Sequence, residues 1–379
     1  MRFLILTADY SAFIGWLYTQ QRGLAVRPYA EQLRMRRQSL FSEPFFLSDN
    51  LKKLGHEAHD IYVNNEYMQK TWAREAGLRF RKDWRWEFRL KRGIGPWISR
   101  IKGCWLYDIL AAQIRYYKPD VLFNQAMDTI SSRFLQEIKR HVGLLLGQHA
   151  ASPLPQGVDF SCYDLVLSSF PPTIKRFRDQ GIPAEFHRLG FGAERLSGMD
   201  GTERPFDLTF VGSLFPIHSS RLALLEALCA RFPQLKVWTP AVDHLAPGSS
   251  IRHCYHGAAW GREMYRIFAR SKITLNHHGN ILPYANNIRL YEATGMGALL
   301  MTDWKKNLHE MFEPGTEVVA YRSADECVEL IHYYLDHKDE REAIARAGQE
   351  RTMREHTYYQ RSKELVGIVT RYLRGRLAA

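Results

Sequence analysis

Two charged residues in the second half of the chain have the types and the spacing to bind a nucleotide. Arg289 and Glu292 stand three residues apart, so on a helix they would share one face. A carboxylate there can accept hydrogen bonds from both hydroxyl groups of a ribose, and a guanidinium can donate two to a phosphate. Gly295 and Gly297 follow, and a glycine lets the backbone approach a ligand closely. The stretch fits a nucleotide site, and taken alone it fits a surface ion pair followed by helix-ending glycines at least as well.

Three polar residues in the first half stand near the ends of expected strands and could accept a proton. Asp9 follows the apolar run "RFLIL", Asp128 follows "VLFNQAM", and His149 follows "GLLLGQ". A hydroxyl group that acts as a nucleophile must lose its proton, and carboxylates and imidazoles can take it. Each residue is therefore a candidate general base, with Asp9 and His149 favoured. Each would also suit a turn or a helix cap.

Histidines and a cysteine gather in a short part of the second half: His253, Cys254, His256, His277 and His278. Their spacings match no standard pattern of zinc ligands. We therefore predict no metal site. His277 and Asn280 come at the end of an apolar run that is expected to be a strand, and we expect them to contact the same ligand as Arg289 and Glu292.

The elements that must position these residues alternate between apolar strands and amphipathic helices, a pattern typical of parallel α/β architecture. Strands are expected at 2–8, 118–125, 142–150, 163–170, 206–214, 234–240, 272–279, 298–303 and 316–321. Residues 47–63 are expected to form a helix that ends at Gly55 and a further strand after it. Helices are expected at 131–141, 171–181, 218–232, 261–271, 286–295 and 323–338, and two more finish the chain. The chain of 379 residues is long for one core and suits two domains.

The polar, glycine-rich stretch "GAERLSGMDGTERP" reads as a linker between the two domains. We predict a Rossmann-like domain at 1–192, a linker at 193–205, and a second Rossmann-like domain with terminal helices at 206–379. Open α/β sheets bind ligands at the carboxyl ends of their strands. A cleft between the two domains is therefore the expected site.

The formal net charge of +12 is unevenly distributed along the chain. Residues 70–102 contain 11 Lys and Arg against 3 Asp and Glu, together with Trp72, Trp84, Trp86 and Trp97. Basic residues interleaved with tryptophan suit an anionic membrane surface. Nucleic acid is the less favoured partner. A solvated basic segment whose tryptophans pack inward has the same composition, so this alternative stays open.

The cysteines and the hydropathy of the sequence indicate the cellular compartment in which the protein is expected. The five cysteines are scattered and form no C-x-x-C pair, as expected in a reducing compartment. The N-terminus reads as a first strand and not as a signal peptide. No run approaches the roughly 20 apolar residues of a membrane span. We predict a cytoplasmic protein that is peripheral at the inner face of the membrane if residues 70–102 bind lipid.

The C-terminal part of the sequence resembles a known family. Residues 286–361 contain R-x-x-E-A-x-x-x-G, an apolar strand, L-x-E-x-F, P-G-x-E, R-x-x-I-A-x-x-G and E-H-T-Y-x-x-R in that order. This series is similar to the C-terminal region of the CgeB-like and group-1 glycosyltransferases. The resemblance implies the GT-B fold, in which two Rossmann-like domains face each other across a cleft. It implies a nucleotide-diphosphate sugar as donor substrate, with no bound metal and no other cofactor.

The resemblance also assigns roles by position. Glu292 would hold the donor ribose, and Arg289 would lie beside the donor phosphates. Further donor contacts would come from Gly212, Ser213, His218 and Arg221. One departure concerns Tyr284, which stands where many group-1 enzymes have a glutamate near the sugar. The sugar contact and the stereochemistry therefore stay open.

These observations predict a glycosyltransferase of polysaccharide biosynthesis that moves a sugar to a hydroxyl acceptor on a glycan, a lipid-linked molecule or a protein. The first domain would bind the acceptor and the second the nucleotide sugar. One alternative is a nucleotide-sugar epimerase or hydrolase on the same fold. Another is a non-catalytic sugar-binding protein of surface assembly. Hydrolysis of the donor without acceptor, or tight donor binding without turnover, would distinguish these alternatives from transfer.

Overall fold

A computed structural model describes residues 1–41, 44–80, 84–91, 95–102, 105–150, 158–193, 199, 203–215, 218–278 and 283–378. The chain forms two compact units. The first comprises Met1–Gln38, Ser48–Ser168 and Ile174–Glu185. The second comprises Ser39–Leu47, Ser169–Thr173 and Phe186–Ala379. The linker expected at 193–205 falls mostly on residues outside this description, and the domain boundaries stay a prediction.

A six-stranded sheet forms the centre of the first unit, in the order β2-β1-β5-β6-β7-β8. Its strands are β1 (Arg2–Thr7), β2 (Glu57–Tyr62), β5 (Val121–Asn124), β6 (Leu144–Gln148), β7 (Leu165–Ser168) and β8 (Ala184–Phe186). The pairings from β2 through β7 are parallel. The order of the strands reverses between β1 and β5, which is the switch point of a doubly wound sheet.

Apolar runs form these strands because helices cover a parallel sheet on both faces. Phe3 through Leu6 are at most 1% exposed. The strands share a core with the apolar faces of α5, α6 and α7. The helices of the N-terminal half are α1 (Ser11–Gln20), α2 (Tyr29–Gln38), α3 (Pro44–Lys53), α4 (Glu66–Glu75), α5 (Trp105–Tyr117), α6 (Ser132–Ile138) and α7 (Pro171–Asp179), with short 3-10 turns at Leu24–Val26 and Lys139–His141.

The basic, tryptophan-rich part of the chain contains a hairpin that the sequence did not predict. Strands β3 (Trp84–Lys91) and β4 (Gly95–Lys102) pair antiparallel, from Trp84 opposite Lys102 to Lys91 opposite Gly95. The side chains from 81 to 104 lie outside the described part of the molecule. The predicted membrane contact of this segment therefore stays a prediction. No described helix is both long enough and apolar enough to cross a membrane.

A five-stranded parallel sheet forms the centre of the second unit, in the order β10-β9-β11-β12-β13. Its strands are β9 (Phe206–Val211), β10 (Lys236–Trp238), β11 (Ser271–Asn276), β12 (Leu299–Asp303) and β13 (Val319–Tyr321). The order reverses between β9 and β11, so this sheet is also doubly wound. The predicted α/β architecture with two parallel sheets is confirmed.

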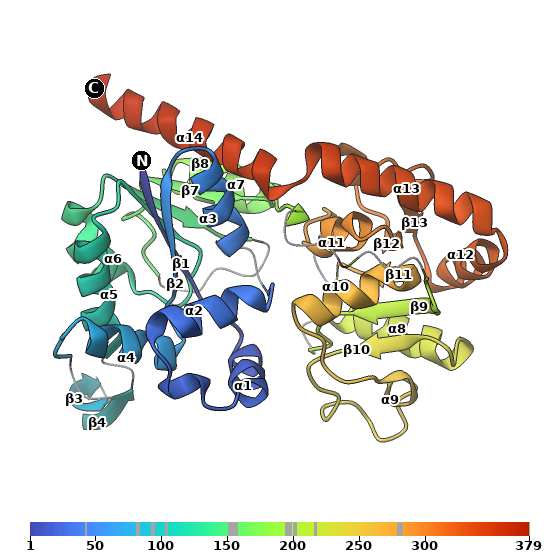
Figure 1. Ribbon diagram of the computed structural model, residues 1–379, viewed down its shortest axis with the longest axis horizontal. Coiled ribbons are helices and arrows are strands. Elements are labelled where there is room, and N and C mark those ends of the chain that lie inside the picture. Colours follow the sequence, from blue (N-terminus) through green and yellow to red (C-terminus); the bar gives the residue numbers. More distant parts are fainter. Residues whose placement is uncertain are drawn as a thin grey trace. The chain divides into compact units, whose positions relative to one another are not determined.

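Helices flank this second sheet and share its core. They are α8 (Ser219–Arg231), α9 (Ile251–Cys254), α10 (Arg262–Ala269), α11 (Arg289–Gly295), α12 (Ala324–Asp336), α13 (Lys338–Glu355) and α14 (Tyr358–Ala378), with a 3-10 turn at Leu308–Glu310. The apolar sides of α8 and α12 pack with β9, β11 and β12. Figure 1 shows α11 and α13, in orange and red, beside β12.

A segment from the N-terminal half completes the second unit. The backbone N–H of Arg262 donates to the carbonyl oxygen of Ser39 at 2.8 Å. The ring of Phe41 meets Trp260 edge-on with centroids 5.1 Å apart, and the ring of Phe46 stacks on Tyr358 at 5.4 Å. Residues 39–47 are therefore part of the packing of the second unit.

Candidate functional site

Arg221 joins two loops at the carboxyl edge of the second sheet. It lies in the first turn of α8, and its Nη1 donates to the carbonyl oxygen of Ser213 at 2.9 Å. Its Nε and Nη2 donate to the carbonyl oxygen of His277 at 3.0 and 2.6 Å. Ser213 follows β9 and His277 follows β11, so the guanidinium bridges the switch point. Burial, and then the charge of Arg289, lower the pKa of Arg221 to about 10.

Arg289 and Glu292 form an ion pair in the first turn of α11, between Nη1 and Oε2, as their spacing predicted. The other carboxylate oxygen of Glu292 accepts a hydrogen bond from the hydroxyl of Tyr265 at 3.0 Å. The guanidinium of Arg289 also lies 5.1 Å from the ring centroid of Phe268. A carboxylate has about four acceptor positions, so these two bonds leave capacity for the hydroxyls of a ribose.

A second polar group surrounds Asp303, which ends β12. Its Oδ1 lies 2.7 Å from Nδ1 of His278, and its Oδ2 lies 3.0 Å from Nζ of Lys305. His277 Nδ1 is 4.0 Å from the same Oδ2. Burial alone would raise the pKa of Asp303, but the hydrogen bond from His278 and the neighbouring positive charges hold it well below its usual range. Burial lowers the pKa of His277 to about 4, so this imidazole is neutral at pH 7.

The remaining donor-site predictions have different outcomes in the structure. Gly212 directly follows β9, and its N–H donates to the carbonyl oxygen of Trp238 at 3.0 Å. His218 directly precedes α8, and burial followed by the charge of Arg221 lowers its pKa. Asn280 lies outside the described residues, so its predicted contact stays a prediction.

Gly295 and Gly297 are explained by packing rather than by a ligand at the carboxyl edge. They lie at the opposite end of α11 from Arg289, where the chain turns toward the start of β12. A Cβ on Gly295 would lie 2.6 Å from the ring of Phe191. Gly297 has a φ of +71°, and a Cβ there would lie 2.8 Å from Arg204. The structure therefore separates both glycines from the residues around Arg221.

The histidine and cysteine cluster has internal partners. His278 is paired with Asp303, and Nδ1 of His256 lies 2.9 Å from the carbonyl oxygen of Cys254. Within the ranges that the structure describes, no group of three or more His, Cys, Asp or Glu side chains is arranged to hold a metal ion. Tyr284, the residue at the departure from the family pattern, packs edge-on against Phe170 with centroids 5.9 Å apart.

Asp9, a candidate base of the first unit, is enclosed in an ion pair. Its carboxylate receives Nε of Arg36 at 2.7 Å and Nη2 at 2.5 Å, and both side chains are fully buried. The guanidinium lies 4.3 Å from the ring centroid of Tyr62 and 4.8 Å from that of Phe13. A carboxylate engaged on both oxygens and shut off from solvent is poorly placed to take a proton from a substrate.

His149 and Asp128 lie together at the carboxyl edge of the first sheet. His149 follows β6, and its Nδ1 lies 3.0 Å from the carbonyl oxygen of Ala150. The other ring nitrogen, Nε2, lies 3.7 Å from Oδ1 of Asp128. Burial lowers the pKa of His149, with Asp128 opposing the effect. The ring is 4% exposed and the carboxylate 54%. A neutral imidazole beside an exposed carboxylate has the properties of a general base.

Sequence reasoning missed Tyr265, Asp303 and Lys305. Asp303 carried a usable signal, because it ends the apolar run "ALLMTD" at the edge where ligands bind. Tyr265 carried none, since it reads as an apolar position of an amphipathic helix. Its hydroxyl reaches Glu292 only because α10 and α11 are neighbours in the fold.

Comparison with known proteins gives one family match. The model of a family described as glycosyl transferase-like matches residues 221–367. This range begins at Arg221 and contains Tyr265, Arg289, Glu292 and Asp303. Among proteins of curated function, none matches the sequence significantly.

Solved structures of similar fold cover almost the whole chain. A glycosyltransferase from Rickettsia africae has a TM-score of 0.62 at 11% identity, over 98% of each chain. The Anabaena protein HepE in complex with UDP-glucose has a TM-score of 0.58 at 11% identity, over 98% of this chain and 99% of its own. The pneumococcal O-GlcNAc transferase GtfA in complex with UDP and GlcNAc has a TM-score of 0.56 at 9% identity, with the same coverage. At these identities the likeness concerns the fold alone.

Proposed function

We propose that this chain, whose residues 221–367 match the glycosyl transferase-like family and which has the GT-B fold, transfers a sugar from a nucleoside-diphosphate donor to a hydroxyl group. One observation carries the proposal. Arg221 bridges the loops after β9 and β11 at the switch point. The positive charge of Arg289 helps to lower the pKa of Arg221, because the two guanidinium groups are close enough to repel each other. Two guanidinium groups beside a buried carboxylate suit a diphosphate attached to a ribose.

Each part of the donor then has a partner. Glu292 accepts hydrogen bonds from the ribose hydroxyls while Tyr265 and Arg289 hold its carboxylate in place. Arg289 and Arg221 face the two phosphates. Gly212 and Ser213, directly after β9, lie against the nucleotide. The likeness to folds solved with UDP and UDP-glucose makes a uridine diphosphate sugar the first donor to test.

Positive side chains supply the charge that the leaving diphosphate requires. Arg221, Arg289 and Lys305 stabilise the charge that develops as the sugar leaves, because fixed cations in a partly buried site need little rearrangement. The reaction then needs no bound metal ion and no other cofactor. Turnover that is equal in EDTA and in Mg²⁺ supports this part of the proposal, and a strict requirement for Mg²⁺ overturns it.

In this proposal the acceptor is a hydroxyl group on a glycan, a lipid-linked molecule or a protein, and the reaction belongs to polysaccharide biosynthesis. In an inverting reaction the hydroxyl loses its proton to a side chain of the first unit. His149 is a better candidate than Asp9, because the carboxylate of Asp9 is bound by Arg36 through both oxygens, whereas Asp128 lies beside the imidazole and can stabilise the resulting charge. In a retaining reaction the leaving phosphate takes the proton.

Calorimetry with UDP tests the donor site. We expect Glu292→Ala and Arg289→Ala each to weaken binding by about 1.5 to 3 kcal/mol, as for hydrogen bonds to charged groups. This corresponds to roughly a 10-fold to 150-fold rise in the dissociation constant.

The matched controls are Arg322→Ala and Glu326→Ala. Each removes one partner of another Arg–Glu ion pair of the same unit, at the start of α12. These variants should bind UDP as the unaltered chain does. Folded Glu292 and Arg289 variants with unchanged affinity for UDP and other nucleoside diphosphates would refute the donor assignment. Hydrolysis of a nucleotide sugar at an equal rate with and without glycan acceptors would favour the hydrolase alternative.

A further inference from the structure

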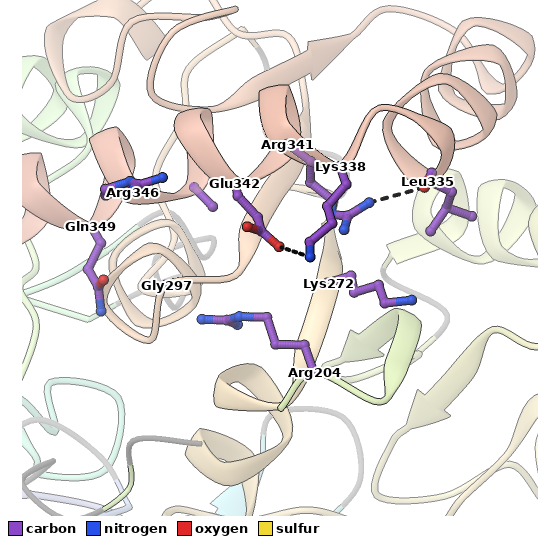
Figure 2. Close-up of a pocket in the computed structure, with 10 residues that line it drawn as sticks. Arg204, Lys272, Gly297, Leu335, Lys338, Arg341, Glu342, Arg346 and Gln349 are labelled. Carbon is purple, nitrogen blue, oxygen red and sulfur yellow. Dashed lines mark hydrogen bonds and ion pairs between the residues drawn. The ribbon is translucent and has the colours of Figure 1, made fainter. Parts of the chain in front are cut away.

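A pocket of about 730 Å³ opens on the second unit away from the residues that the donor is proposed to contact. Figure 2 shows its lining, with several basic side chains directed toward a common space. The lining residues are Arg204, Lys272, Gly297, Leu335, Lys338, Arg341, Glu342, Ala345, Arg346 and Gln349. A volume in this range accommodates a small molecule.

The pocket lies at the amino edge of the second sheet. Arg204 stands two residues before β9, Lys272 is the second residue of β11, and Gly297 stands two residues before β12. One side of α13, from Lys338 to Gln349, completes the wall. The proposed donor site uses residues after the same strands, at the carboxyl edge. The two sites are therefore separated by the length of the strands, and this inference does not rest on the proposed function.

The charges around the pocket are strongly unbalanced. Five lining side chains are basic and one, Glu342, is acidic. Lys272 is also paired with Asp207 at 2.6 Å, which leaves an excess of three positive charges. Lys338 lies 3.9 Å from Glu342, too far for a direct hydrogen bond, and this contact is drawn in Figure 2. Within the described part of the chain, Arg346 forms no ion pair. Burial lowers the pKa of Arg204, with Glu342 opposing the effect, so the positive charge there is costly without an anion.

Two of the cations are held rigidly by the backbone. Arg204 donates from Nη1 to the carbonyl oxygens of Phe268 and Ser271 at 3.3 and 2.8 Å, and from Nη2 to that of Met296 at 3.2 Å. Arg341 donates from Nη1 to the carbonyl oxygens of Tyr334 and Leu335 at 2.7 and 3.1 Å. An arginine has five N–H donors, so both retain donors for a ligand. Fixed guanidinium groups lose little side-chain entropy when an anion binds.

We propose that this pocket is a second binding site, which takes a diphosphate group either free or carried by a small molecule. A diphosphate carries more negative charge than a single phosphate, so it matches an excess of three cations better. Bidentate binding of phosphate by arginine supplies the directional contacts. Gly297 has a left-handed backbone and leaves room for two lining side chains, because a Cβ there would crowd Arg204 and Gln349.

Calorimetry on the full chain tests the proposal, with inorganic diphosphate as the probe, at low salt, with and without one equivalent of UDP. We expect diphosphate to bind at least 10-fold more tightly than orthophosphate, to bind in the presence of UDP, and to weaken with added salt. The variant Lys338→Ala/Arg346→Ala removes two exposed cations and should lose at least 10-fold in affinity. Glu342→Gln removes the acid and should tighten binding.

The matched control is Arg322→Ala/Arg354→Ala, which removes two exposed cations of the same unit outside the pocket. It should keep the affinity for diphosphate. Equal binding of orthophosphate and diphosphate, equal losses in the two double variants, or full displacement of diphosphate by one equivalent of UDP would each overturn the proposal. If the chain binds a second UDP and the pocket variant does not, the pocket takes a diphosphate carried by a small molecule. If the chain binds inorganic diphosphate but no second UDP, the pocket takes the free ion. The pocket variants report on this site even if UDP does not bind at the carboxyl edge.

Discussion

Asp9 and His149 both follow strands of the first unit, but their surroundings differ in the property that a base needs. The carboxylate of Asp9 is bound by Arg36 through both oxygens and is fully buried. The imidazole of His149 instead lies 3.7 Å from the half-exposed carboxylate of Asp128. At the scale of single residues, hydrogen-bond partners decide between two candidates that look equal in the sequence.

We predict that His149→Ala lowers turnover by about 100-fold or more while the affinity for the donor stays unchanged. This result requires an inverting reaction, in which the imidazole takes the proton of the acceptor hydroxyl. Asp128→Asn should lower turnover less, because its carboxylate acts only through the imidazole. Steady-state kinetics and donor calorimetry on the same preparations provide the measurement.

Asp9→Asn is the informative comparison for this prediction. Breaking a buried ion pair costs roughly 3 to 5 kcal/mol, so the free energy of unfolding should fall. Turnover per folded molecule should stay near that of the unaltered chain. A 100-fold fall in turnover of folded Asp9→Asn, with His149→Ala fully active, would return the role of base to Asp9.

The sequence predicted contacts between near neighbours and missed those between distant segments. The spacing of Arg289 and Glu292 fixed their common face, and the structure pairs them. His278 meets Asp303 because β11 and β12 are adjacent, and no local spacing encodes that adjacency. Arg36 of α2 likewise reaches Asp9 across 27 residues of chain.

At the scale of elements, α11 is held by close packing at its last residue. A Cβ on Gly295 would lie 2.6 Å from three atoms of the Phe191 ring. We therefore predict that Gly295→Ala lowers the free energy of unfolding by about 1 to 3 kcal/mol, as overpacking does. Urea denaturation provides the measurement.

Gly367→Ala is the matched control, because Gly367 lies inside α14 and its nearest neighbour to a Cβ is 3.9 Å away. An alanine in a helix interior is more stable than a glycine by about 0.5 to 1 kcal/mol. The two glycine replacements should therefore have opposite signs. Stabilisation by both would show that the Phe191 ring yields without cost.

The junction of α13 and α14 contains a buried histidine that makes stability depend on pH. Nε2 of His356 lies 2.9 Å from the carbonyl oxygen of Met311, and Nδ1 lies 2.8 Å from Nη2 of Arg361. Burial is the main reason that its pKa falls to about 4. The folded chain therefore binds this proton more weakly than the unfolded chain, whose histidine has a pKa of about 6.5. The stabilisation is complete above that value and falls as the pH drops toward 4.

We predict that His356 contributes about 2 kcal/mol of the loss in unfolding free energy between pH 7.5 and pH 5. Denaturation curves of the unaltered chain and of His356→Gln at both pH values measure the contribution as a difference. His277 has a similarly lowered pKa and adds to the total, so His277→Gln serves as a second variant. An identical pH dependence in all three proteins would contradict the assignment.

The apolar runs of the sequence predicted most strands in their order along the chain, but they did not predict the hairpin of β3 and β4. The runs at "RFLIL" and "ALLMT" became buried parallel strands because both faces of such strands are covered. The hairpin of β3 and β4 escaped prediction because charged residues fill its sequence and mask the strand pattern. The order of the strands within each sheet could not be predicted from the sequence, since it depends on packing between segments far apart along the chain.

At the scale of the whole molecule, the net charge of +12 is concentrated in residues 70–102. We predict that the chain binds vesicles containing anionic lipid and that added salt weakens the binding. Arg85→Glu/Lys91→Glu reverses two charges in the hairpin and should reduce vesicle binding by 10-fold or more, since each basic residue near the surface contributes about 1 kcal/mol. Flotation of the full chain with liposomes measures the effect.

Arg133→Glu/Arg140→Glu is the control for this prediction, because it reverses two exposed charges of the first unit outside that segment. Its binding to vesicles should change little. Equal losses in the two double variants would mean that net charge alone drives the binding. If anionic and neutral vesicles both leave the chain unbound, the segment has a structural role.

The aromatic segment at 39–47 gives this protein a particular problem during synthesis. Phe41 leaves the ribosome more than 200 residues before its partner Trp260, and Phe46 leaves it still longer before Tyr358. At 5 to 20 residues per second, the first of these delays lasts about 10 to 40 seconds. The nascent chain therefore carries exposed aromatic rings that a chaperone would shield. A gene fragment that begins at residue 186 would encode the second unit without them, and its product would expose the surface on which those rings pack.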